Sequence, residues 1–174
     1  MTRIRALLLV LVLLAAALVR GAVAASAAPA ASASRCGDAS LAVTAGRAQG
    51  ATGHGSFIVL FQNISGVRCR IHGYPGLDAI GRKGHLLKHA KRTLSGFTGG
   101  SRHGVPTVVL RPGRFASADV EWLNFASGGK SCKFSLSVNA TPANTGYTVH
   151  LARSVSLCHL QVHPTVPGRS GNFG

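Results

Sequence analysis

The sequence has very few acidic residues. It contains 4 Asp and Glu against 19 Lys and Arg in 174 residues, which gives a formal charge of +15. Catalysis by paired carboxylates and binding of Ca²⁺ or Mg²⁺ by carboxylate clusters both require more acids than this chain supplies. Hydrophobic residues make up 46% of the chain, which is too high for a disordered protein. The length and composition therefore predict one folded, strongly basic domain.

The N-terminus has the layout of an export signal. Arg3 and Arg5 precede residues 6–19, an uninterrupted run of Ala, Leu and Val, and small residues follow Arg20. This order is typical of a secretory signal peptide. The apolar run is also shorter than the roughly 18–20 residues that span a bilayer. We predict a signal peptide over residues 1–27, with an uncleaved membrane anchor as the alternative.

The remaining chain divides into three parts. Cleavage after Ala27 is favoured over cleavage after Ala24. A flexible leader of Ala, Ser and Pro is expected at 28–35, a folded domain at 36–166 and a flexible tail at 167–174. The signal peptide carries three Arg and no acid, so the exported chain keeps 16 basic and 4 acidic residues, a charge of +12. We expect this chain to be secreted, or associated with the cell wall.

The cysteines are typical of the same oxidising compartment. All four follow the export signal, and their even number predicts two disulfides. None forms Cys-x-x-Cys, which argues against a thioredoxin-type redox pair and a zinc ribbon. Three pairings are possible, and proximity in sequence favours Cys36–Cys69 with Cys132–Cys158.

The exported chain is rich in short apolar or alternating segments, separated by Gly, Pro, Asn and Ser. These predict strands at Leu41–Thr44, Ser56–Gln62, Arg68–His72, Thr107–Leu110, Phe115–Leu123, Phe134–Val138, Tyr147–Leu151 and Leu160–Val162. The continuous apolar centre of the second segment indicates burial on both faces. Residues 85–94 form either a short helix or a basic loop or hairpin. The predicted fold class is all-β, an antiparallel, immunoglobulin-like β-sandwich with two disulfides.

The sequence contains few recognisable catalytic motifs. No Gly-x-Ser-x-Gly elbow occurs, and the cysteines are assigned to disulfides. Asp119 and Glu121 share one face of a predicted strand, opposite Val120 and Trp122. We interpret them as a surface pair that balances neighbouring cations. A hydrolase that combines one of these acids with a His is the rival hypothesis, and a non-enzymatic protein is expected.

Two histidine pairs have metal-ligand spacing. His85 and His89 are four residues apart, as are His159 and His163. Neither pair is accompanied by a carboxylate or a free Cys that would complete a site. We therefore expect no bound metal and no cofactor.

One basic stretch suggests a surface function. Its five cations, within eleven residues, are Arg82, Lys83, Lys88, Lys91 and Arg92. Such a stretch attracts anionic polymers or membrane headgroups in a salt-dependent manner. It lacks the interleaved aromatics that stack on bases, so specific nucleic-acid binding is not expected. The predicted partner is an anionic cell-wall polymer or membrane surface, bound by a monomer. The alternatives are a solvated loop without function and a module that binds envelope proteins.

The order of particular residues also resembles a known family. The most distinctive segment is Cys69-Arg-Ile-His-Gly73-Tyr74-Pro75-Gly76. Around it, in order, lie Cys36, Phe61-Gln-Asn63, Leu77, Gly81, Val109-Leu110-Arg-Pro112-Gly113, Ala116, Ala118, Trp122, Cys132, Val138, Pro142, Cys158 and Pro164. Over residues 36–165 this order resembles the actinobacterial secreted family called domain of unknown function 4232.

The resemblance implies an exported or lipid-anchored β-rich domain with its cysteines in disulfides, and no catalytic residues. This chain departs from the pattern because no lipid-attachment Cys follows its apolar run, so we expect it to be released. Tyr74, Pro75 and Gly76 are interpreted as scaffold: Pro75 and Gly76 are a favourable pair if they occupy the two central positions of a turn, where Gly76 can take a positive φ.

Overall fold

The computed structural model describes residues 32–97 and 104–172. Apart from Ser32, these belong to one compact unit, Ala33–Gly174. The predicted signal peptide and residues 28–31 of the predicted leader lie outside the described residues. Among the described residues, no helix has the length and apolar character needed to cross a membrane.

Strands make up nearly all of the regular structure. They are β1 (Ser34–Arg35), β2 (Leu41–Ala51), β3 (His54–Asn63), β4 (Cys69–His72), β5 (Gly76–Ile80), β6 (Leu86–His89), β7 (Lys91–Arg92), β8 (Thr107–Leu110), β9 (Phe115–Leu123), β10 (Ser137–Thr141), β11 (Val149–Leu151), β12 (Cys158–Val162) and β13 (Val166–Pro167). Three single 3₁₀ turns, η1 (Asp38–Ser40), η2 (Arg82–Gly84) and η3 (Ser127–Gly129), connect some of them. The expectation of an all-β antiparallel sandwich with two disulfides is confirmed.

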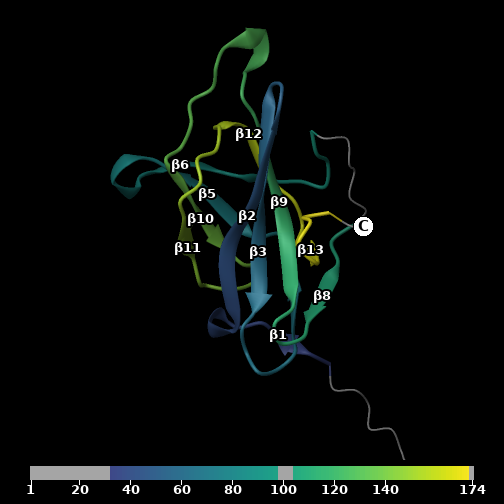
Figure 1. Cartoon of the computed structure of the whole chain (residues 1–174). Helices are drawn as coiled ribbons and strands as arrows, with labels where there is room; N and C mark the ends of the chain where they lie inside the picture. The colour runs from purple at the N-terminus through teal and green to yellow at the C-terminus, as the bar shows by residue number, and fades with distance from the viewer. Residues whose placement is uncertain (1–31, 98–103, 173–174) are drawn as a thin grey trace, which may run out of the picture. The chain divides into compact units, whose positions relative to one another are not determined.

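The strands form three sheets (Figure 1). The largest has the order β2-β3-β9-β12-β7, with β13 also paired to β9, and the second has the order β11-β10-β5-β6. The third sheet has the order β1-β4-β8. Two short pairs are parallel, β1 with β4 and β12 with β7, and the other ladders are antiparallel. The parallel pairing of β7 with β12 places Lys91 opposite Gln161, which is far from it in the sequence.

Two long strands organise the core. All five residues of the apolar run 57–61 in β3 are buried, as their continuous hydrophobicity predicted. β9 pairs along its length with β3, and it is buried from Ala116 to Trp122. Apolar residues from all three sheets pack against this pair, including Leu77, Leu110 and Leu160. Burial at the usual ~25 cal/mol per Å² of apolar surface makes this core the main stabilising element.

The two disulfides have the pairing favoured by the sequence. Cys36 bonds to Cys69, and both are buried. Cys132 bonds to Cys158, and both are half-buried. Each bridge fastens a short peripheral segment to a sheet.

Ordered structure extends beyond both expected domain boundaries. Ser34 and Arg35, assigned to the flexible leader, form β1 and pair with β4. In the expected tail, Pro167 belongs to β13, and the guanidinium of Arg169 lies 3.9 Å from the centre of the Phe115 ring. The Gly171 N–H donates to Ser117 Oγ at 2.9 Å. These residues are ordered by backbone pairing and side-chain stacking. Neither interaction is evident from the local composition of the sequence.

Two local expectations, at Gly76 and at Phe134–Val138, were wrong, and the alternatives left open for residues 85–94 are decided against a helix. The left-handed residue of the 73–76 segment is Gly73, at φ +112, whereas Gly76 begins β5 without a positive φ. Residues 85–94 contain strands β6 and β7 and no helix. The strand expected at Phe134–Val138 starts three residues later, at Ser137, and Phe134 makes only an isolated bridge to Ser156.

Candidate functional site

The five predicted anion-binding residues are exposed, but the structure separates them into three places. Arg82 and Lys83 lie in the turn η2. Lys88 lies on the edge strand β6, and Lys91 and Arg92 form β7. Within residues 32–97 and 104–172, none of the five is ion-paired with a carboxylate. Their charges are therefore available to an external anion.

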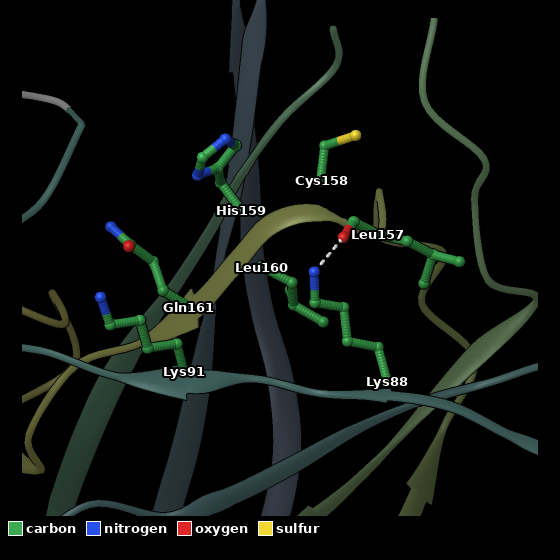
Figure 2. A pocket seen from close by; sticks show the side chains of 7 residues that line it. All are labelled: Lys88, Lys91, Leu157, Cys158, His159, Leu160 and Gln161. Atoms are coloured by element: carbon green, nitrogen blue, oxygen red, sulfur yellow. Dashed lines mark hydrogen bonds between the residues drawn. The ribbon is translucent and has the colours of Figure 1, made fainter. Parts of the chain in front are cut away.

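Lys88 and Lys91 both line a hollow between β6, β7 and β12. The hollow has a volume of about 460 Å³, and its remaining lining is the segment from Leu157 to Gln161 (Figure 2). None of the described residues that line it is acidic. A concave surface with several donors and no carboxylate is suited to an anion.

Lys88 is held in place at this hollow. Its ammonium donates to the Leu157 carbonyl oxygen at 2.6 Å (Figure 2). This contact joins β6 to the start of β12 and leaves two of the three N–H groups of Lys88 available. The side chain is therefore positioned before any ligand arrives, which lowers the ordering cost of binding.

Arg92 faces a different hollow. That space, of about 370 Å³, is also lined by Asp78 and His89. The imidazole of His89 lies 2.6 Å from Asp78, through Nδ1 and Oδ1. Lys88 and His89 are neighbours on β6, and successive strand residues point to opposite sides. The Asp78 carboxylate and the ammonium of Lys88 are consequently on different sides of β6.

The expectation that Asp119 and Glu121 form a surface pair was wrong. Asp119 is 6% and Glu121 1% exposed. Glu121 Oε1 accepts hydrogen bonds from His163 Nε2 and, at 3.1 Å, from Gln161 Nε2, while Oε2 accepts from the Phe97 N–H at 3.0 Å. These acids are buried because β9 is a central strand. Other segments of the chain cover the face of β9 to which Asp119 and Glu121 point.

Burial and hydrogen bonding act on Glu121 in opposite directions. Desolvation raises the pKa of this carboxyl, whereas the hydrogen bonds from His163 and Gln161, the Coulombic interaction with His163 and the hydrogen bond from the Phe97 N–H lower it. The net pKa lies below the usual value of 4.5, so Glu121 is ionised in the folded protein. The buried carboxylate needs all of these partners because an unpaired buried charge is very costly.

Close packing at Glu121 requires a glycine. A Cβ at Gly96 would lie 2.6 Å from Glu121 Oε1 and 3.4 Å from His163 Cε1. The backbone of residues 95–97 can therefore approach the carboxylate only without a side chain at this position. Together, these contacts tie the segment after β7 to the largest sheet.

The paired histidines are not brought together as ligands. His159 is exposed, whereas His163 is fully buried against Glu121. His85 is exposed, and His89 contacts Asp78. Among the described residues, no three His, Cys, Asp or Glu side chains gather as a potential metal site.

His159 and the Leu157 carbonyl are parts of the hollow that sequence reasoning missed. They lie about seventy positions after Lys88, and the parallel pairing of β7 with β12 brings them together. No local spacing in the sequence indicates that pairing.

Comparison with known proteins identifies a family but no individual relative. No curated protein and no solved structure matches the chain. The model of the family described as Domain of unknown function (DUF4232) matches residues 36–166, so the chain belongs to this family.

Proposed function

We propose that this protein is a secreted, non-enzymatic β-sandwich module that binds an anionic polymer of the cell envelope. The observation that carries the proposal is the hollow of about 460 Å³ that Lys88 and Lys91 line, with no acid among the described lining residues. Two disulfides are consistent with an oxidising compartment outside the cytoplasm.

The charge balance supports an anionic partner. The exposed cations of β6, β7 and η2 face few carboxylates, since Asp119 and Glu121 are buried. A field of this sign attracts polyanions from a distance, and its strength falls with ionic strength. The concave shape favours a polymer chain over a planar surface, because a chain can enter a recess.

The histidine–carboxylate contacts give little support to the rival hydrolase. His163 and Glu121 have side chains 0% and 2% exposed, so a substrate has no access to them without rearrangement. His89 is exposed and Asp78 half-buried, but none of the described residues that line their hollow is a nucleophilic Ser or Cys.

Binding to purified cell-wall polymer tests the proposal. The purified protein is sedimented with the polymer at increasing salt, and a Lys88→Glu, Lys91→Glu, Arg92→Glu variant is compared with wild type. We expect the variant to bind at least about tenfold more weakly, and binding by wild type to weaken as salt rises.

A matched control separates local from general charge. The Arg47→Glu, Arg111→Glu, Arg114→Glu variant has the same change in net charge, and its three positions are exposed and absent from the hollow. Equal losses in the two variants would overturn the proposal. Binding of wild type to vesicles of anionic phospholipid, but not to the polymer, would also overturn it and would identify a membrane surface as the partner.

A further inference from the structure

The residue between Cys158 and Leu160 has an unusual backbone. His159 adopts φ +50, a left-handed conformation that is uncommon for a residue with a side chain. It lies in an irregularity of the β12–β9 ladder, where the register shifts between Cys158 and Gln161. Bulges of this type re-aim a side chain, and strained residues persist only where the surroundings hold them.

The surroundings of His159 hold it firmly. On one side, Cys158 is fixed by its disulfide to Cys132. On the other side, Leu160 is 1% exposed and anchored in the core. The exposed imidazole lies edge-on to the Phe97 ring, with 6.1 Å between the ring centres. The fold therefore maintains a strained conformation that presents the imidazole at the hollow (Figure 2).

We infer that His159 completes a phosphate subsite with Lys88 and Lys91, and that this subsite takes one polyol-phosphate unit of the polymer. The inference rests on the proposed function and names the group that is recognised. Lys88 supplies two free N–H donors from a fixed position, Lys91 supplies an ammonium, and the imidazole supplies at least one N–H. Phosphate oxygens accept several charge-assisted hydrogen bonds at once, which matches this set of donors.

The nearby carboxylate does not oppose an anion in the hollow. Gln161 lies between them, with its amide N–H groups donating to Ser95 O and Glu121 Oε1, both at 3.1 Å. Glu121 is also hydrogen-bonded to His163 and Phe97. The volume of about 460 Å³ falls within the roughly 300–1,000 Å³ of small-ligand sites, so it accommodates a phosphate with its attached polyol.

The test uses glycerol 3-phosphate as the probe, with inorganic phosphate and glucuronate as comparison ligands. Binding is followed by the chemical shifts of the imidazole protons of the purified protein. We expect glycerol 3-phosphate to shift the His159 resonances in a saturable manner, and glucuronate to bind at least about fivefold more weakly. Equal binding of the carboxylate would overturn the assignment to phosphate.

Substitution of the strained residue separates recognition from folding. His159→Gly removes the imidazole but accepts φ +50 readily, so we expect at least about a fivefold loss of glycerol 3-phosphate affinity with a thermal midpoint equal to or above that of wild type. His150→Ala, at an exposed histidine on β11, is the control and should bind as wild type. Unchanged affinity in His159→Gly, or a lowered midpoint that accompanies the loss, would overturn the inference.

The two proposals can fail separately. If wild type binds the polymer and the charge-reversal variant does not, while His159→Gly binds both polymer and glycerol 3-phosphate normally, the phosphate subsite is wrong and the proposed function stands. If wild type fails to bind the polymer, the proposed function is wrong whatever the small ligand does.

Discussion

Two histidine–carboxylate contacts in this domain have the same chemistry and opposite environments. Glu121 and His163 are 2% and 0% exposed, whereas Asp78 and His89 are 35% and 73% exposed. In the buried contact, Gln161 and the Phe97 N–H also bind the carboxylate. In the exposed contact, water can replace either partner. The contact between Glu121 and His163 therefore stabilises the fold, whereas the contact between Asp78 and His89 is a surface feature.

Removal of the buried charge should have the largest effect. Glu121→Gln keeps the size of the side chain but leaves His163, which is fully buried, without its anionic partner. We expect the free energy of unfolding to fall by about 3–5 kcal/mol, the usual cost of breaking a buried ion pair on one side. Chemical denaturation measures this loss. A loss below about 1 kcal/mol would show that burial does not distinguish the two contacts.

A methyl group beside the same carboxylate should have the next largest effect. Gly96→Ala places a Cβ 2.6 Å from Glu121 Oε1 in the present geometry, so either the carboxylate or the 95–97 backbone must move. We expect a loss of about 1–3 kcal/mol, typical of overpacking, in the same denaturation assay. Gly50→Ala is the control, since a Cβ there meets nothing within 4 Å. Equal stability of the two variants would contradict the close packing described here.

The buried contact should also make the stability of the protein depend on pH. The folded pKa of Glu121 is below 4.5, so its contribution is fully present above the unfolded pKa and is lost as the pH falls through the folded pKa. The stability difference between wild type and Glu121→Gln should therefore shrink progressively as the pH falls below about 4.5. Denaturation at a series of pH values checks this. A difference that stays constant down to pH 3 would contradict an ionised, paired Glu121.

Much of the fold could be predicted from the sequence, because its strongest signals are local. The apolar run in β3 and the strand at Phe115–Leu123 were located correctly, since burial on both faces and a long β-rich segment are visible in a short window. The surface placement of Glu121 was wrong for a related reason. Its alternation with Val120 and Trp122 shows that it points away from them, but says nothing about what covers that side.

The candidate hollow could be predicted only in part. The charge of Lys88 and Lys91 is evident from composition, and both line the hollow. His159 is absent from that prediction because its position depends on the irregular register at Cys158–Gln161 and on the parallel pairing of β12 with β7. Arg92 belongs to the same basic stretch of the sequence, but it lines the other hollow, together with Asp78 and His89.

Removal of the exposed carboxylate should have the smallest effect. Asp78→Asn abolishes the charge that contacts His89, but both side chains are substantially solvated and the attraction is screened. We expect the free energy of unfolding to change by less than about 0.5 kcal/mol, with little dependence on salt because so little energy is involved. Since His89 points to the other side of β6 from Lys88, binding of glycerol 3-phosphate in the hollow should also be unchanged. Denaturation of this variant beside Glu121→Gln is the direct comparison. Similar losses in the two variants would mean that exposure does not decide what a histidine–carboxylate contact contributes.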